Sequence, residues 1–277
     1  MPDRAQPSTA RPDPARPRIL AIANQKGGVG KTTTAINLAT ALAATGQPTL
    51  LIDLDPQGNA STGLGLPRTE RGAGSYALIA EARPLADVTR ATAIPGLSLV
   101  PADQDLAGAE IELVSLTRRE FRLRDALAAE RFESRTIVLI DCPPSLGLLT
   151  VNALVAADAV LVPLQCEFFA LEGISQIMRT IEMVRRGLNP SLALQGIVLT
   201  MFDRRNNLSD LVAADVRGFF GDKVYETVIP RNVRISEAPS HGKPVLLYDV
   251  RSAGAQAYLA LAKELLRRER TAAGAAS

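Results

Sequence analysis

The sequence is poor in net charge, in cysteine and in histidine. Its 31 Lys and Arg residues nearly balance 29 Asp and Glu residues, which leaves a formal net charge of only +2. A nucleic-acid site would therefore have to be a local basic patch. Cys142 and Cys166 lack metal-ligand spacing, and with no secretory signal we expect two reduced, buried thiols.

The single histidine, His241, lies in a Ser-His-Gly-Lys segment that is typical of a loop. We therefore expect no catalytic role for it. Ser145 has no histidine near it in the pattern, and this excludes a serine-hydrolase mechanism.

Long hydrophobic runs are also missing. No segment approaches the roughly 20 consecutive apolar residues that a membrane span requires. Hydrophobic residues still make up 47% of the chain, enough for a sizeable core. We expect a cytoplasmic protein with no membrane partner.

The chain divides by composition into a tail, one domain and a second tail. Residues 1–17 hold five prolines and charges of both signs, a composition that predicts disorder. Residues 18–270 show no internal repeat and no long linker, so we expect a single domain there. Residues 271–277 are expected to form a flexible tail.

Within this domain, short apolar runs alternate with helical segments. We expect strands at residues 19–23, 49–53, 97–101, 136–141, 159–163, 195–200 and 224–228. We expect helices at residues 32–44, 118–130, 146–156, 171–186, 208–219 and 252–269. Strands rich in Leu, Ile and Val between helices predict an α/β fold with a mostly parallel twisted sheet and helices on both faces.

A glycine-rich segment links the first strand to the first helix. Residues 24–34 read NQKGGVGKTTT. Glycines let backbone N–H groups turn toward phosphate oxygens, and the helix that follows points its positive end at the same anion. Gly30, Lys31 and Thr32 fit the end of the general P-loop pattern, whereas its first glycine is replaced and a second lysine, Lys26, precedes a glycine pair. This context predicts a P-loop NTPase-like fold.

The chemistry of this loop requires a cation and an ordered water. Lys31 would neutralise the β- and γ-phosphate oxygens, and the Thr32 hydroxyl would bind Mg²⁺. Asp53 and Asp55 share a face at the end of a predicted strand, where open α/β sheets bind their ligands. Asp141 ends another apolar strand in a Walker B pattern and would hold Mg²⁺ directly or through a water.

The string KGGVGKT resembles the deviant Walker A motif of the ParA/MinD family of ATPases. DLDPQGN, which contains Asp53 and Asp55, resembles switch I of that family, and the Pro-Pro pair after Asp141 resembles its switch II. The resemblance implies that Asp55 orients the attacking water and that Asp53 supports the site near Mg²⁺. It also implies that Lys26 reaches across a dimer interface to the partner's nucleotide, with Gly27 where the facing subunit packs.

The same resemblance implies ATP and Mg²⁺ as cofactors. Its catalytic residues would be Lys26, Lys31 and Asp55, and its metal residues Thr32, Asp53 and Asp141. The nucleotide would be bound by Lys26, Gly27, Gly28, Val29, Gly30, Lys31, Thr32 and Thr33, with Met201, Pro230, Arg231 and Asn232 bordering the adenine.

The C-terminal third resembles the chromosomal ParA/Soj branch, which partitions DNA together with a ParB protein. This likeness rests on residues 228–244, VIPRNVRISEAPSHGKP, and on residues 167–173 and 200–203. It implies an ATP-bound homodimer that binds double-stranded DNA without sequence preference and is reset by ParB-stimulated hydrolysis. Arg205, Arg234 and Lys243 would contact the DNA, and the protein would be nucleoid-associated.

The residues favour DNA partitioning over three other functions. A MinD-like membrane-cycling ATPase would need a bulky amphipathic C-terminal helix, whereas this chain ends in charged and small residues. A metal or electron carrier of the same superfamily would need a cysteine pair at a dimer interface, and neither Cys142 nor Cys166 resembles that arrangement. A scaffold without hydrolysis is disfavoured because Lys31, Asp55 and Asp141 are all present.

Overall fold

The computed structural model describes residues 16–167 and 170–275. Its sheet has seven strands in the order β3-β4-β2-β5-β1-β6-β7. The strands are β1 (Arg18–Ile22), β2 (Thr49–Asp53), β3 (Arg90–Ala91), β4 (Leu97–Val100), β5 (Ile137–Asp141), β6 (Ala159–Gln165) and β7 (Ala193–Thr200). All neighbours pair in parallel except β3, which runs antiparallel to β4 at one edge. The predicted α/β class with a mostly parallel sheet is confirmed.

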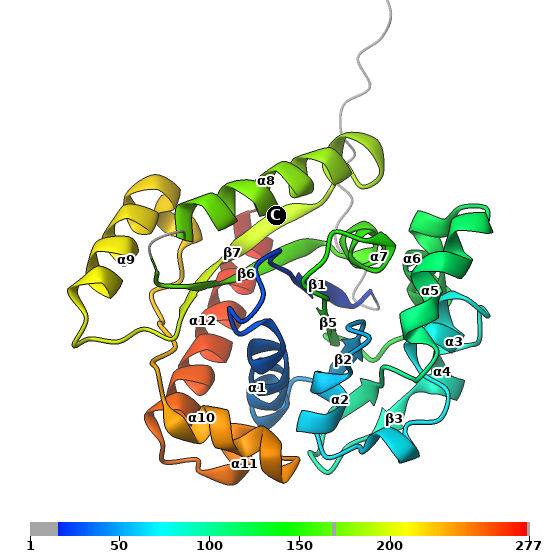
Figure 1. Cartoon of the computed structure of the whole chain (residues 1–277), viewed down its shortest axis with the longest axis horizontal. Helices are drawn as coiled ribbons and strands as arrows, with labels where there is room; N and C mark the ends of the chain where they lie inside the picture. Colours follow the sequence, from blue (N-terminus) through cyan, green and yellow to red (C-terminus); the bar gives the residue numbers. More distant parts are fainter. Residues whose placement is uncertain (1–15, 168–169, 276–277) are drawn as a thin grey trace, which may run out of the picture.

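Helices cover both faces of this sheet (Figure 1). The longer ones are α1 (Lys31–Ala44), α7 (Leu148–Ala156), α8 (Ala170–Gly187), α9 (Asn207–Phe220) and α12 (Ala253–Ala275). The shorter ones are α2 (Asn59–Gly63), α3 (Ser75–Ile79), α4 (Leu85–Val88), α5 (Leu106–Glu112), α6 (Arg122–Ala128), α10 (Val233–Glu237) and α11 (Val245–Tyr248).

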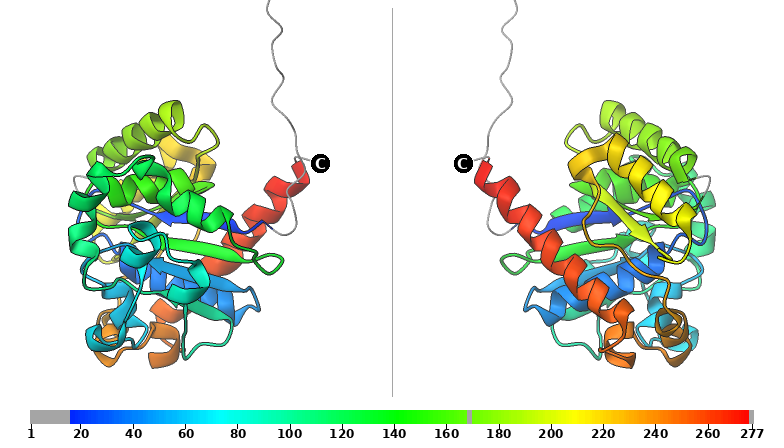
Figure 2. Two further views of the ribbon diagram at one scale, coloured as in Figure 1. Left: turned by 90° about the vertical axis from the view of Figure 1, so that its right-hand side faces the viewer. Right: turned by 90° about the vertical axis from the view of Figure 1, so that its left-hand side faces the viewer.

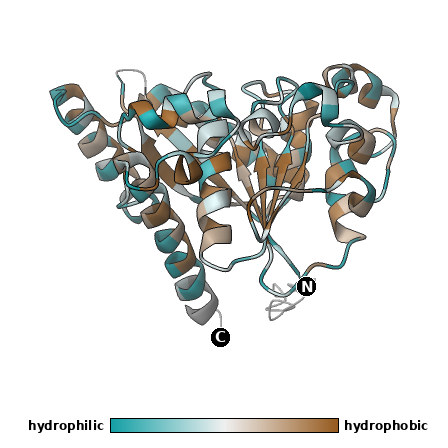
Figure 3. Ribbon diagram, turned by 90° about the horizontal axis from the view of Figure 1, so that it is seen from below, coloured by the Kyte–Doolittle hydropathy of each residue, from teal (hydrophilic) through white to brown (hydrophobic). Residues whose placement is uncertain are grey.

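Alternation along the strands divides the interior into two hydrophobic cores. On β1, Ile19 and Ala21 pack with the core that includes α7, α8 and α9, whereas Leu20 and Ile22 pack with α1 and α12. Because successive side chains of a strand point to opposite faces, a central strand has to be apolar on both. Figure 3 shows these hydrophobic strands between the helical layers.

One expected strand is absent. Residues 224–228 make only an isolated bridge, from Val224 to Ile197, after a 3-10 helix at Gly221–Lys223. The Glu264 carboxylate accepts hydrogen bonds from the Glu226 and Thr227 N–H groups, both at 2.9 Å. These backbone groups are therefore not available to extend the sheet beside β7.

Several predicted boundaries were also wrong. The helix expected at residues 118–130 is a 3-10 turn, Arg119–Phe121, followed by α6, because Arg118 has a left-handed φ of 54°. The antiparallel strand β3 and the short helices α2 to α5 were not predicted. α12 continues to Ala275, so residues 271–275, expected as tail, are helical. Figure 2 shows α12 running past the body of the domain.

The predicted disorder of residues 1–17 falls mainly outside the described residues, which begin at Arg16. Arg16 itself forms an ion pair of 2.8 Å with Asp158. No helix among residues 16–167 and 170–275 combines the length and apolar composition needed to cross a membrane.

Candidate functional site

The glycine-rich loop lies between the end of β1 and the first residue of α1, near the centre of the view in Figure 1. Gly28 and Gly30 have left-handed φ values of 75° and 85°, a conformation in which a side chain would be strained. The loop thus turns sharply and leads directly into α1. The first N–H groups of α1 have no partner within the helix. Such a helix start favours an anion.

Neighbouring strands hold this loop in place. The Asn24 amide donates to the Pro163 carbonyl at the end of β6, and the Thr200 hydroxyl at the end of β7 donates to the Val29 carbonyl, both at 2.8 Å. Asn24 also accepts from the Lys26 N–H at 3.0 Å. The loop shape is therefore fixed by contacts across the sheet as well as by its own glycines.

Lys31 lies folded over the loop. It is only 6% exposed, and its ammonium donates to the Lys26 carbonyl at 2.9 Å. Burial lowers the pKa of Lys31, and the carboxylates of Asp141 and Asp55 oppose that effect. The lysine predicted to neutralise phosphate oxygens therefore lies beside the predicted metal-site acids.

The sheet brings Asp53 and Asp141 together. β2 and β5 are adjacent, and their register pairs Asp53 directly with Asp141, next to Ile22 at the end of β1. Both aspartates are fully buried. Asp53 accepts hydrogen bonds from the Ser61 N–H and hydroxyl at 2.8 and 2.7 Å. Burial raises the pKa of Asp53 to about 6, although the Ser61 hydrogen bonds oppose the rise.

Asp141 is the least compensated acid of the described residues. No hydrogen bond of regular geometry reaches either of its buried carboxylate oxygens. Burial and the neighbouring Asp53 raise its pKa well above the ordinary value, while the nearby Thr32 hydroxyl and Lys31 oppose this. A buried carboxylate without a partner is costly unless a cation or hydrogen bonds compensate it.

These residues fit a magnesium ion. Asp141 offers two free oxygens beside Thr32 and Asp53, at the mouth of a phosphate-binding loop. The described residues contain no group of three or more His, Cys, Asp or Glu side chains that could hold a metal alone. Mg²⁺ does not need one, because it commonly takes one or two carboxylates and completes its shell with phosphate oxygens and waters.

Asp55 occupies the first turn after β2. It is 7% exposed, and its carboxylate accepts from the Gln57 N–H at 3.0 Å. The Gly58 N–H donates to the Asp55 carbonyl at 2.8 Å and closes a tight turn. The turn therefore fixes the direction of this carboxylate, next to Asp53 and Lys31.

The residues predicted to border the adenine line one cavity of about 280 Å³ beside the loop. Its walls include Gly30, Thr33, Met201, Pro230, Arg231, Asn232 and Tyr258. Met201 has a left-handed φ of 50°, which is unusual for a bulky side chain and typical of strain at functional sites. The segments after β7 and before α10 thus form one concave wall next to the phosphate loop.

Known proteins share this arrangement. Residues 17–194 match the protein family described as the AAA domain. The chain is 66% identical over 254 residues to the chromosome partitioning protein ParA of Caulobacter vibrioides, covering 91% of this chain and 95% of that relative. The chain belongs to the ParA/MinD family. It is also 53% identical over 248 residues to the sporulation initiation inhibitor protein Soj of Bacillus subtilis, covering 90% and 98%. It therefore falls in the ParA/Soj group, a group of ATPases.

A solved relative supports the predicted cofactors. Cobyrinic acid a,c-diamide synthase of Mycobacterium smegmatis, with a bound ATP analogue and magnesium, matches at a TM-score of 0.81 and 39% identity, covering 92% of this chain and 97% of that one. Its name describes another reaction, so the likeness supports the fold and the nucleotide chemistry rather than the substrate. ATP and Mg²⁺ are the cofactors that agree with this site.

The signature lysine of the ParA/MinD family has a partner within the chain. The Lys26 ammonium forms an ion pair with Glu167, just after β6. A Cβ on the neighbouring Gly27 would meet no heavy atom of the described residues within 4 Å, apart from the two adjacent residues of the chain. Packing within one subunit therefore does not require glycine at position 27.

The three predicted DNA-contacting residues lie on the surface, in different local settings. Arg205 forms a 2.9 Å ion pair with Asp203, and Arg234 pairs with Glu237 at 2.9 Å and Asp249 at 3.6 Å. Lys243 is exposed and has no ion pair among the described residues. The carboxylates neutralise part of the positive charge of both arginines in the single subunit.

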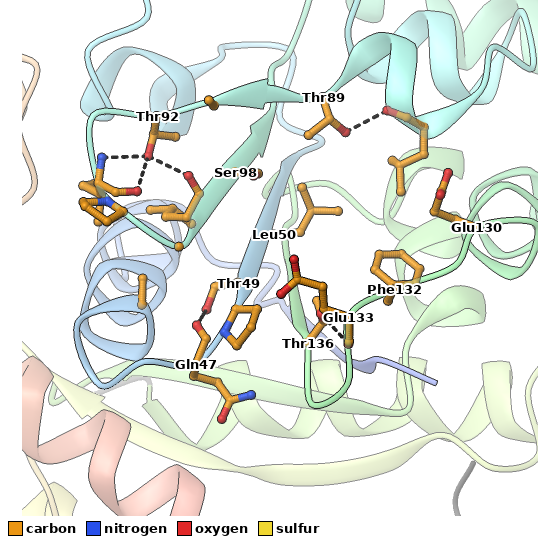
Figure 4. A pocket seen from close by; sticks show the side chains of 18 of the residues that line it. Gln47, Thr49, Leu50, Thr89, Thr92, Ser98, Glu130, Phe132, Glu133 and Thr136 are labelled. Carbon is orange, nitrogen blue, oxygen red and sulfur yellow. Dashed lines mark hydrogen bonds between the residues drawn. The ribbon is translucent and has the colours of Figure 1, made fainter. Parts of the chain in front are cut away.

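A larger cavity, of about 870 Å³, lies at the opposite edge of the sheet (Figure 4). Its polar side chains bond to nearby backbone. The hydroxyls of Thr49, Thr92 and Thr136 donate to the carbonyls of Gln47, Leu97 and Glu133 at 2.7–2.8 Å. No unpartnered buried polar atom of the described residues lines it. We assign it no chemistry.

The sequence reasoning missed the residues that support the site. Asn24, Thr200 and Glu167 lie within segments that carry the family resemblance and Ser61 lies outside them, yet no pattern predicts that these residues contact the loop or the acids. Their partners are distant in sequence: the Thr200 hydroxyl and the Val29 carbonyl are 171 positions apart. Only the folded arrangement identifies them.

Proposed function

We propose that this protein is an ATP-driven DNA-partitioning ATPase that dimerises on ATP, binds DNA without sequence preference, and is reset by weak hydrolysis. The observation that carries the proposal is the convergence of Lys31, Thr32, Asp53, Asp55 and Asp141 at the carboxyl ends of β1, β2 and β5. The partitioning role is supported by the names of the relatives from Caulobacter vibrioides and Bacillus subtilis.

The first part of the mechanism is binding of the phosphates. The N–H groups of residues 27–33 and the Lys31 ammonium would bind the β- and γ-phosphate oxygens. Thr32 and Asp141, with Asp53 in support, would hold Mg²⁺, which when bound neutralises charge on the phosphate oxygens. Met201, Pro230, Arg231 and Asn232 would enclose the adenine.

The second part is hydrolysis. Asp55 would accept a hydrogen bond from a water and hold it in line with the γ-phosphate, because positioning supplies most of the catalysis in phosphoryl transfer. Lys26 would exchange Glu167 for the phosphates bound by a second subunit and would stabilise the charge that develops there. The open space at Gly27 supports a close approach of that subunit.

The third part is DNA binding by the dimer. Two copies of Arg205, Arg234 and Lys243 would contact phosphates at once, so ATP-dependent dimerisation would double the contacts and steepen the salt dependence. A ParB-type protein would stimulate hydrolysis and release the DNA. In the cell the protein would be cytoplasmic and associated with the nucleoid.

The decisive experiment measures binding to a non-specific DNA duplex with ATP, with ADP and without nucleotide. We expect binding with ATP only, together with a dimer in sedimentation. Equal binding in all three conditions, or none in any, would contradict the proposal. Addition of a ParB-type partner and DNA should then raise the ATPase rate above the basal rate.

A further inference from the structure

A buried arginine outside every sequence motif lies behind the turn that carries Asp55. Arg71 is 3% exposed, and none of the carboxylates in the described residues forms an ion pair with it. Burial lowers the pKa of its guanidinium, and nearby Asp53 opposes this. An arginine stays charged even so, and a charge in such a place requires a full set of acceptors.

The acceptors of Arg71 come from residues 58–66, where Nε donates to the Leu66 carbonyl at 3.5 Å, and from the segment after β4. One nitrogen, Nη2, donates to the Gly58 carbonyl at 2.8 Å and to the Thr62 hydroxyl at 2.7 Å, in and beside α2. The other, Nη1, donates to the Ala102 carbonyl at 3.1 Å, just after β4. The planar guanidinium thus joins the segment after β2 to the segment after β4.

Gly58 is the link between this arginine and the site. Its N–H closes the turn onto the Asp55 carbonyl, while its own carbonyl is held by Arg71. Gly58 has a left-handed φ of 64°, and a Cβ there would lie 1.9 Å from Nη1 of Arg71. The guanidinium therefore occupies the space that a side chain at position 58 would need.

We propose that Arg71 is a positioning residue for ATP hydrolysis, which sets the Asp55 carboxylate by fixing the Gly58 end of its turn. The inference rests on the role proposed above for Asp55. Arg71 has no part in holding the nucleotide, since its donors all point to protein oxygens. It should therefore affect the turnover step more than the binding of ATP.

The test compares steady-state ATPase kinetics of the parent with Arg71→Ala, Arg71→Lys and Asp55→Ala, each checked for folding by circular dichroism. Arg71→Ala should lower kcat by about 10- to 100-fold, the effect of a small misplacement of a catalytic group, with a much smaller change in KM. The kcat of Arg71→Lys should lie between those of the parent and Arg71→Ala, because a lysine can donate to the Gly58 carbonyl but cannot also reach the Ala102 carbonyl. Arg68→Ala, which removes an exposed arginine nearby, is the matched control and should behave like the parent.

A second variant, Gly58→Ala, keeps the proposal testable if Arg71→Ala does not fold. Gly58→Ala pushes against the guanidinium and also strains the turn itself, because φ is 64° at this position; it should lower kcat more than it raises KM and so tests the role of the turn. Arg71→Lys then decides the role of the guanidinium. Parental kcat in the folded Arg71 variants while Asp55→Ala is inactive would overturn the inference alone. Parental kcat in Asp55→Ala would instead overturn the proposed role of Asp55. If KM of the Arg71 variants rises by the same factor as kcat falls, Arg71 has a structural role only and does not position Asp55.

Discussion

At the scale of single residues, the site concentrates carboxyl groups in the interior. Asp53 and Asp141 lie side by side, fully buried, and the oxygens of Asp141 have no partner. Such a cluster costs folding free energy, and sites of this kind are retained because a cation and a phosphate group complete them.

Asp55→Ala tests the water-positioning role. We expect kcat for ATP hydrolysis to fall by about 10²-fold or more, because the in-line water loses its acceptor, while ATP-dependent dimerisation persists. The measurement is phosphate release at saturating ATP. Asp222→Ala removes an exposed acid beside the amino ends of β1 and β7 and serves as the control. Hydrolysis at the parental rate in Asp55→Ala would refute the role.

The pKa of Asp53 predicts a pH dependence of stability without nucleotide. Its folded-state pKa is raised from 3.8 to about 6, so the folded chain keeps this proton longer than the unfolded chain. Its contribution to the free energy of unfolding therefore falls as pH rises from about 4 to about 6, by roughly 2–3 kcal/mol, and then levels off. Urea titrations of the parent and Asp53→Asn across this range measure it. The decrease should be smaller in Asp53→Asn, in which the raised pKa of Asp141 still contributes, and an equal decrease in both would contradict the assignment.

At the scale of elements, α12 supports the phosphate loop from behind. It packs along α1, and its Tyr258 both lines the adenine-side cavity and lies 3.4 Å from the Thr34 hydroxyl of α1. On the same helix, Glu264 holds the segment that leads toward Pro230. One C-terminal helix thus contributes to the adenine-side wall and holds the segment that precedes it.

Leu261→Ala tests how much this packing contributes. Leu261 is fully buried in the core shared by α1 and α12, so its truncation should lower the free energy of unfolding by about 2–5 kcal/mol. The exposed Leu247 provides a control, since Leu247→Ala should change stability by less than about 0.5 kcal/mol. Chemical denaturation gives both values. A change as small as that of the control would show that α12 packs loosely.

At the scale of the whole molecule, two features point beyond one subunit. Lys26 is paired within its own chain, and Gly27 borders open space. The arginines expected to contact DNA are partly neutralised by carboxylates of the same subunit. Assembly is therefore the expected means by which both sets of residues become active.

Gly27→Val should separate folding from assembly. A Cβ at this position meets none of the described residues beyond its two chain neighbours, so the free energy of unfolding should stay within about 0.5 kcal/mol of the parent, whereas ATP-dependent dimerisation should be lost. Analytical ultracentrifugation with ATP is the measurement. Gly218→Val, placed in equally open space on α9, should still dimerise. A Gly27→Val protein that dimerises normally would refute the sandwich arrangement.

Arg234→Glu should weaken DNA binding while ATP binding stays unchanged. Loss of a phosphate contact lowers the slope of log K against log salt by about 0.9 for each copy. Fluorescence anisotropy over a salt series measures this, with the exposed Arg186→Glu on α8 as the charge-matched control. Loss of ATP binding together with DNA binding would indicate instead that Arg234 acts at the nucleotide.

The class of fold and most strands could be predicted because their apolar runs are local. The failure at residues 224–228 has a tertiary cause, since Glu264, on a helix some 40 residues later, captures the N–H groups that a strand would use. β3 is only two residues long and gives no periodic signal. Arg118 and Met201 adopt left-handed backbones that their residue types do not predict.

The phosphate loop, the strand-end acids and the family can be read from the sequence, because each depends on residues close together in the chain. The tertiary structure alone decided that Asp141 lies beside Asp53, that Lys26 pairs with Glu167, and that Arg71 lies behind Gly58. These contacts join residues far apart in sequence and arise from strand order, register and burial. A motif specifies which groups are present, whereas packing decides which of them meet and how each is charged.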